Sequence, residues 1–594
     1  MKAKHGMLGS GIHLIVVVAA LSYIGNGALA ATITPSDLPG GATPGGAQPL
    51  LEKIPKIHKE TAPEVRSPSP EKLPTIRDSG VRMVVQAFVL DGVIDHPERG
   101  IKKEDIEHKI EEIRLTRPGG FTISELQEVT DEITKIYRSA GYILARAYIP
   151  EQEVTDGKVV IKILEGNLEK VTFQNNHDYS EKTLSKPFKE LIDKPVNKDE
   201  VESALLVLSD YPGLKFNSVF SPGDTSGTAK LGINVDDEKK TEGAVWLDNY
   251  GTKYTGEYRF WVDAALNNPT GAADRLSTQL LTSFGDKSGN SDYYALSYQR
   301  PVFGFRNLFS IDANKNSFKV GGIFSDLDLV GESTAMSTSL RRKFIRSKQM
   351  NVEGLVSLAS KKSSTDISGA TLGQDDLTVL GIGSSMDYRD SWSGYTQGSL
   401  NYSQGLPGVL GAMNKDGNGT SSRTDANGAH VGGDFKKINL YLSRWQSLNF
   451  EPQLINQTLL VRMQAQSTND MLVSMEQMSL GGPTSVRAYP SSEYMVDKGY
   501  FMSLEWIAKS REASKGMLFE DLQFSVFYDY AAGELNNPLV NDVKAPKLKG
   551  AGISLQIAPQ QKYLARLELA KPLGGPEPSN RRSIQYFFKF GYLF

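Results

Sequence analysis

The sequence predicts a transmembrane β-barrel of about sixteen antiparallel strands, preceded by two small α/β domains. Three observations lead to this fold class. The last ~350 residues alternate between apolar and polar positions and lack helical periodicity. Two earlier stretches each follow the order β-α-α-β-β. The amino-terminal residues form a secretory signal, so we expect the chain to be exported.

Composition and charge narrow the classes of function. The formal net charge of −3 and the pI near 6.3 argue against a nucleic-acid binder. The chain has no cysteine, which excludes a thiolate metal site, a cysteine nucleophile and disulfides. No stretch beyond the signal reaches 18 apolar residues, so the sequence predicts no membrane-spanning helix. Membrane-spanning β-strands are not excluded, because strands that alternate between apolar and polar residues have a low mean hydropathy.

The first segment, residues 1–30, is predicted to be a signal peptide. Lys2 and Lys4 precede the apolar run IHLIVVVAAL, and the small residues of Ala28–Ala30 follow it. The apolar run is too short to span a bilayer. The mature chain is therefore expected to begin at Ala31.

Residues 31–80 are predicted to form a proline-rich linker. Nine of the 28 prolines lie between Thr32 and Gly80, which favours an extended or disordered segment. The run LLEKIPKIHKE is a candidate plug helix, but Pro55 interrupts it.

Residues 81–166 are predicted to form the first α/β domain. Its first strand is VRMVVQAFVLDG and its first helix is KKEDIEHKIEEI. The second helix begins at Thr122, with Glu125 in capping-box spacing, and ends before Gly141. Two strands, YILARAYIP and GKVVIKILEG, complete the domain.

Residues 167–238 repeat the same order. A helix over NKDEVESALLVLSDYPG has Asn197 and Glu200 in capping spacing, and the strands LKFNSVFSPG and TAKLGINVDD follow. Two tandem copies of one small module favour a binding arm over a catalytic domain.

Residues 239–594 are predicted to form the barrel. In its last strand every even position from Ile584 to Phe594 is apolar or aromatic, which is typical of a strand with one face toward lipid. The run PGVLGAMNKDGNGTSSRTDANGAHVGG is predicted to be a long extracellular loop. Its NKDGNG motif lacks the EF-hand glutamate and spacing, so we assign no metal and no cofactor.

This order of segments resembles the two-partner secretion transporters, the hemolysin activation/secretion proteins of Gram-negative outer membranes. Their paired modules are called POTRA domains. In the modules, YRSAGYILARAYIPEQEVTDGKVVIKILEG and FSPGDTSGTAKLGINV carry the resemblance. At the start of the barrel, the turn motifs Asp248–Asn249 and Asn268–Pro269 carry it.

The stretch EQMSLGGPTSVRAYPSSEYMVDKGYFMSLEW resembles the sixth extracellular loop of this family. The resemblance implies that the loop folds back into the barrel with a Val-Arg-Gly-Tyr tetrad. Here the tetrad is Val486, Arg487, Ala488 and Tyr489. Alanine stands where glycine is usual, and a positive φ would strain it.

The resemblance also implies a partner for the loop arginine, an aspartate in a Phe-x-Asp motif on an inner strand. Phe527 and Asp529 supply this motif, although Ala531 stands where a glycine commonly follows. Period-two alternation places Asp529 on the face of Phe527 and Ser525. A carboxylate on a barrel strand is expected to face the lumen, because charge facing lipid is costly.

The function that the resemblance implies is export of one large exoprotein through the barrel, after the POTRA modules bind it in the periplasm. The sequence leaves the exoprotein open between an adhesin, a cytolysin and a contact-dependent toxin. The resemblance also implies an outer-membrane location in contact with lipid. The terminal Phe594 is expected to be a signal for the barrel assembly machinery.

Three alternatives fit the sequence less well. A factor that inserts other outer-membrane proteins usually carries more than two POTRA modules, and a diffusion porin needs none. For an enzyme, the seven histidines are scattered, and there is no Gly-x-Ser-x-Gly or phosphate-binding loop. The acidic pair Asp375–Asp376 is interpreted as solvated loop charge.

Overall fold

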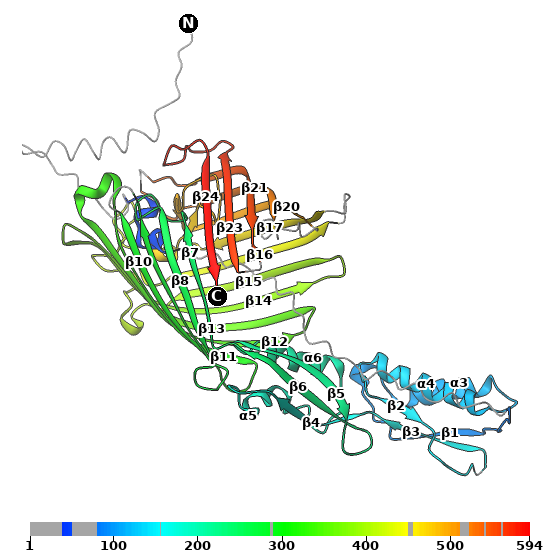
Figure 1. The fold of residues 1–594 in the computed structure, drawn as a ribbon. Helices are drawn as coiled ribbons and strands as arrows, with labels where there is room; N and C mark the ends of the chain where they lie inside the picture. The colour runs from blue at the N-terminus through cyan, green and yellow to red at the C-terminus, as the bar shows by residue number, and fades with distance from the viewer. Residues whose placement is uncertain are drawn as a thin grey trace, which may run out of the picture.

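The computed structural model describes residues 38–49, 80–154, 156–285, 289–448, 455–510, 522–539, 542–559 and 562–594. It confirms the predicted fold class, since a closed barrel carries two α/β domains at one end (Figure 1). The predicted signal peptide and the candidate plug helix over 50–60 lie outside the described residues. In the described part of the chain, no helix has the length and apolarity to cross a membrane.

The first α/β domain has the predicted order of elements. It consists of β1 (Ala87–Asp91), η3 (Pro97–Arg99), α3 (Lys103–Leu115), α4 (Ile123–Ser139), β2 (Arg146–Tyr148) and β3 (Lys158–Leu164). The sheet order is β1-β3-β2, with β1 parallel to β3. The capping box is present, because Thr122 and Glu125 each accept a hydrogen bond from the other's backbone N–H. The first strand is shorter than predicted, since Met83 makes a single bridge to Phe121 instead of pairing with β3.

The second α/β domain repeats this arrangement. It consists of β4 (Asn167–Gln174), α5 (Glu181–Leu184), η4 (Lys186–Phe188), α6 (Lys198–Ser209), β5 (Leu214–Pro222) and β6 (Thr228–Glu238). Its sheet order is β4-β6-β5, and Leu205 and Leu208 of α6 lie in the core with Leu231 of β6. Asn197 caps α6 by accepting a hydrogen bond from the backbone N–H of Asp199. Each domain therefore has its own core and its own sheet edges.

The barrel is one closed antiparallel sheet of sixteen strands. In chain order the strands are β7 (Thr241–Asp248), β8 (Tyr258–Asn267), β9 (Arg275–Phe284), β10 (Asn290–Pro301), β11 (Asn307–Lys319), β12 (Leu329–Arg346), β13 (Met350–Ile367), β14 (Ala370–Arg389), β15 (Gly394–Gly405), β16 (Lys436–Leu448), β17 (Ile455–Ser467), β20 (Lys498–Ser510), β21 (Gln523–Glu534), β22 (Lys547–Ile557), β23 (Tyr563–Pro572) and β24 (Gln585–Leu593). The sheet closes where β24 pairs with β7. A barrel of this size is wide enough to leave an aqueous channel unless other segments fill it.

Side chains alternate between the lumen and the outer face, as the sequence predicted for the last strand. Phe590 and Tyr592 of β24 are exposed, whereas Phe587 and Lys589 are buried. On β21, Val526 and Tyr528 are exposed, whereas Asp529 is buried. Buried polar side chains on these strands therefore mark the lumen.

The second α/β domain is fixed to the nearer rim of the barrel (Figure 1). Asp210, at the end of α6, accepts hydrogen bonds of 2.8 and 3.0 Å from Arg346 of β12 and is also bonded by Lys343. Burial acts to raise the pKa of Asp210, but Lys343 and Arg346 outweigh it, so the pKa lies below its ordinary value. Thr183 donates to the carbonyl oxygen of Gly271 at 3.1 Å, in the turn between β8 and β9. These contacts hold the domain in one orientation against the barrel.

One expectation about the opposite rim is wrong. The predicted extracellular loop over 407–433 joins β15 to β16, and its Met413 and Val431 are buried in a cluster with Leu377 of β14. Asp375 is not a solvated loop charge, because it is 1 % exposed and accepts a hydrogen bond of 2.9 Å from the backbone N–H of Ser422. The physical reason is that loop 407–433 covers the end of β14, which carries Asp375.

Candidate functional site in the barrel lumen

Loop 468–497, between β17 and β20, folds back into the lumen. A short hairpin of β18 (Met478–Leu480) and β19 (Tyr494–Val496) forms its stem. Gly481, at the end of β18, has a φ of 97°, and a Cβ there would lie 2.5 Å from the carbonyl oxygen of Pro490. Glycine is therefore required at this turn, which directs the loop tip inward.

Arg487, at the loop tip, is 2 % exposed and contacts five inward-facing side chains, one of which is Ser503, whose hydroxyl accepts from Nη2 at 3.2 Å. Its Nε donates to Asp529 Oδ2 at 2.8 Å and its Nη2 donates to Asp529 Oδ1 at 2.9 Å. Its Nη1 donates to Glu505 Oε2 at 2.9 Å and to Glu568 Oε1 at 3.2 Å. Its guanidinium also lies over the ring of Phe527. The structure thus brings Arg487 together with Phe527 and Asp529, the motif named from the sequence.

The electrostatic setting favours a permanently charged arginine. Burial acts to lower the pKa of Arg487, but Asp529 and Glu505 outweigh it and raise the pKa above its ordinary value. Three carboxylates surround one guanidinium, and Arg462 lies 3.8 Å from Glu505. Removing the arginine would leave several buried negative charges close together, which is strongly destabilising for the seated loop.

The other tetrad residues pack the loop against the wall. Val486, Ala488 and Tyr489 are fully buried in one cluster. The Tyr489 hydroxyl donates to the carbonyl oxygen of Pro576 at 3.1 Å. The described non-glycine residues with positive φ do not include Ala488, so alanine is unstrained there. The Cβ of Ala488 fits because Gly550 of β22 has no side chain. A Cβ on Gly550 would lie 2.2 Å from the Cβ of Ala488.

A second segment of the chain, residues 38–49, also lies in the lumen (Figure 1). It contains η2 (Gly40–Ala42) and α2 (Pro44–Ala47). Barrel side chains donate to its backbone: Thr252 to the carbonyl oxygen of Gly41 at 3.1 Å, and Asn316 to that of Ala47 at 3.2 Å. The sequence assigned this stretch to the linker, since a Gly/Pro-rich segment recognised through its backbone has almost no side-chain signature.

Segment 38–49 touches loop 468–497 directly. Ser492 donates to the carbonyl oxygen of Gly46 at 2.9 Å, and the backbone N–H of Gly45 donates to the Ser474 hydroxyl at 3.3 Å. A Cβ on Gly45 would lie 1.9 Å from the carbonyl oxygen of Ser474. The two luminal segments are therefore in van der Waals contact, and only glycine permits the approach at residue 45.

Asp248 and Asn249 lie at the seam that closes the barrel. Asp248 is fully buried and pairs bidentately with Arg259 at 2.7 and 3.0 Å. Asn249 continues the pairing between β7 and β24, since it donates to the carbonyl oxygen of Tyr586 and accepts from the N–H of Phe588. The sequence predicts Asp248 and Asn249 only as turn residues, whereas in the structure they also connect the first and last strands of the barrel.

Asn268 and Pro269 lie in the turn that faces the second α/β domain. Asn268 has a φ of 55°, and its side chain donates to the carbonyl oxygen of Asp178 at 3.0 Å. Pro269 is exposed in the same turn.

Phe594, which follows β24 at the seam between β24 and β7, exchanges two backbone hydrogen bonds with Gly243 of β7. A Cβ on Gly243 would lie 2.4 Å from the Phe594 ring, so the terminal ring packs directly on β7.

Sequence reasoning missed Glu505 and Glu568. A usable signal was present, because Glu568 stands alone between Leu567 and Leu569, both of which face outward. Glu505 likewise lies between Leu504 and Trp506. A lone carboxylate in an alternating barrel strand indicates a position toward the lumen.

Two family models match this chain. The model described as haemolysin secretion/activation protein ShlB/FhaC/HecB matches residues 227–557, more than half of the chain. A model of the ShlB-type POTRA domain matches residues 101–166. This chain belongs to the ShlB/FhaC/HecB family. It is an outer-membrane transporter of two-partner secretion, and its POTRA domains lie in the periplasm.

Relatives support the family assignment along most of the transporter. The heme/hemopexin transporter protein HuxB of Haemophilus influenzae (strain 86-028NP) is 28% identical over 461 residues, 76% of this chain and 78% of HuxB. The outer membrane transporter CdiB of Dickeya dadantii is 23% identical over 452 residues, 73% of this chain and 75% of CdiB. The structure of CdiB from Escherichia coli has the same fold, with a TM-score of 0.68, 18% identity and full coverage of both chains. The curated relatives of this family that match the chain are transporters.

Proposed function

We propose that the transporter binds one large exoprotein through its POTRA domains and exports it through the lumen, once segment 38–49 and loop 468–497 move aside. One observation carries this proposal: a barrel wide enough for an aqueous channel is filled by two segments held through hydrogen bonds and ion pairs. Such segments can leave without breaking the barrel sheet. Since the periplasm supplies no ATP, folding of the exported chain outside the cell drives export.

The first POTRA domain offers the surface that fits an extended substrate. Its strand β1 is at the edge of the sheet, and a groove of about 340 Å³ runs between β1 and α3. Phe88 and Ile110 supply apolar lining, and Glu107 and Glu111 supply negative charge. An extended segment can add to a sheet edge through its backbone, and pockets beside the edge then select its side chains. We propose a segment with alternating apolar and basic residues as the occupant.

A charge reversal in the groove tests this proposal. Glu107→Lys is expected to weaken binding of the exoprotein's amino-terminal domain to the full-length transporter by about ten-fold at low salt, with a smaller effect at high salt. Binding is measured by calorimetry in detergent micelles, and secretion by the amount of exoprotein in the medium. Glu104→Lys is the matched control, because Glu104 is an exposed residue of α3 outside the groove. Equal affinity of the two variants would contradict the groove assignment.

The terminal residue is proposed to direct assembly of the barrel. Deleting Phe594 removes a ring that packs on Gly243 and two backbone hydrogen bonds at the seam. We expect the amount of folded barrel in the outer membrane to fall about ten-fold, consistent with a loss of ~1.4 kcal/mol or more at the closing pair. The measurement is the heat-modifiable band in outer-membrane fractions. Phe303→Ala, which truncates an exposed phenylalanine in a turn between two strands, is the control. Normal assembly without Phe594 would refute this role.

A further inference from the structure

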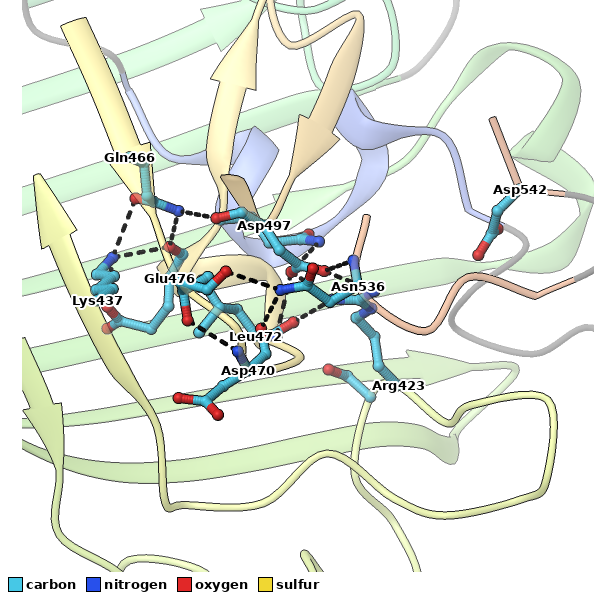
Figure 2. Close-up of polar contacts among 12 residues, drawn as sticks. Arg423, Lys437, Gln466, Asp470, Leu472, Glu476, Asp497, Asn536 and Asp542 are labelled. Atoms are coloured by element: carbon cyan, nitrogen blue, oxygen red, sulfur yellow. Dashed lines mark hydrogen bonds and ion pairs between the residues drawn. The ribbon is translucent and has the colours of Figure 1, made fainter. Parts of the chain in front are cut away.

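A buried carboxylate lies where loop 468–497 returns to the barrel wall. Asp497, directly before β20, has no exposed surface. It accepts hydrogen bonds from the backbone N–H of Leu472 at 3.2 Å and from Gln477 Nε2 at 3.0 Å. Figure 2 shows Leu472 beside Asp497. Asp497 therefore joins the outgoing and returning ends of its own loop.

A neighbouring loop supplies the positive charge. Arg423, in loop 406–435 between β15 and β16, donates to Asp497 Oδ1 at 2.7 Å and to Oδ2 at 3.3 Å (Figure 2). It also donates to the carbonyl oxygen of Leu472. From a third loop, the backbone N–H of Asn536 donates to Asp497 Oδ2 at 2.8 Å. Three loops on the extracellular side thus meet at Asp497.

A second buried carboxylate, Glu476, is anchored differently. Its partners are Lys361 of β13 at 2.6 Å and Lys437 of β16 at 2.8 Å, both on the barrel wall. Burial acts to raise the pKa of Glu476, but the two lysines outweigh it and lower the pKa to about 2. Glu476 therefore ties loop 468–497 to fixed strands, whereas Asp497 ties it to another loop.

Loop 406–435 covers the first residues of loop 468–497. Val431 and Phe435 are buried in one apolar cluster with Leu472 and Val473. Because the loops pack together around a charged pair, they cannot separate without exposing this cluster and breaking the contact between Arg423 and Asp497. The pair is shielded from solvent, so salt screens it weakly.

We propose that Arg423 and Asp497 form a latch that keeps the extracellular mouth closed and couples the opening of loop 406–435 to that of loop 468–497. Loss of Arg423 leaves a buried carboxylate without its counter-ion, which raises the free energy of the closed state relative to the open state. Coupling of this kind is reciprocal, so release of either loop favours release of the other.

Labelling of one introduced cysteine tests the latch on intact cells, because the chain has no cysteine of its own. Val473→Cys places a thiol at a position that is 2 % exposed, at the contact between the loops. A membrane-impermeant maleimide then reports how often the loops separate. Adding Arg423→Gln is expected to raise the labelling rate about ten-fold, which corresponds to ~1.4 kcal/mol. Arg423→Lys, which keeps the charge, is expected to stay closer to the parent.

A control variant in loop 406–435 distinguishes the effect of losing the latch from the effect of losing any ion pair in that loop. Lys415→Gln removes an exposed pair with Asp434 at 3.7 Å and should leave the labelling rate unchanged. Asp497→Asn should raise the rate, and the double variant with Arg423→Gln should label no faster than the faster single variant. Equal rates for Arg423→Gln and Lys415→Gln, or multiplied effects in the double variant, would overturn the latch. The assay needs no exported protein, so its outcome is independent of the proposed substrate groove.

Discussion

Replacing Arg487 by alanine is expected to reduce secretion more than about 100-fold while the barrel still assembles. The substitution removes the cation shared by Asp529, Glu505 and Glu568, and removing one partner of a buried pair typically costs ~3–5 kcal/mol. The loop tip is then expected to leave the barrel wall, because its departure lets water reach the three carboxylates on the wall and solvate them. The measurement is exoprotein in the medium, with heat-modifiability of the barrel measured on the same cells.

Two further variants and one control test whether the loss of secretion comes from the ion pair between Arg487 and Asp529. Asp529→Ala is expected to act in the same direction, since it removes the bidentate partner of Arg487. Arg487→Lys retains the charge but loses the two parallel bonds, so an intermediate result is expected. Arg444→Ala is the matched control, because it breaks a 2.7 Å pair with Asp390 at the periplasmic end of the barrel. Normal secretion by both Arg487→Ala and Asp529→Ala would show that the pair has no role in export.

The second large effect is expected at Gly45. Gly45→Leu cannot be accommodated, because even a Cβ would lie 1.9 Å from the carbonyl oxygen of Ser474. Overpacking of this kind costs ~1–3 kcal/mol, so segment 38–49 should leave the lumen roughly 10-fold more often. Single-channel recording of the purified transporter in planar bilayers measures this change as a higher ratio of open to closed time.

The control for Gly45→Leu is a glycine with free space around it. Gly419→Leu, in loop 406–435, adds the same side chain where no atom lies within 4 Å of the Cβ position. It should leave the recordings unchanged. Deleting residues 38–49 should open the channel at least as much as Gly45→Leu. An unchanged open time in the deletion variant would show that this segment does not obstruct the pore.

Local patterns were sufficient to predict the architecture. Period-two alternation predicted the barrel strands, because one face of each strand meets lipid and the other meets the lumen. Capping residues and 3.6-residue periodicity predicted α3 and α4 to within a few residues. For the luminal pair, alternation placed Asp529 on an inward face, and the resemblance of loop 468–497 to a known family pointed to Arg487. These features are local, so a short window of sequence contains them.

The packing of the extracellular half depends on contacts between distant residues. Arg423 and Asp497 are separated by 74 positions, and no short-range pattern relates them. Segment 38–49 binds through its carbonyl groups and through the absence of Cβ atoms, so its composition is the same as that of a linker. The sequence alone thus specified a barrel of about sixteen strands, the order of segments along the chain and the inward position of Asp529. The seating of segment 38–49 and the latch at Asp497 arise in the folded barrel, because closure of the sheet is what brings these backbones and charges within bonding distance.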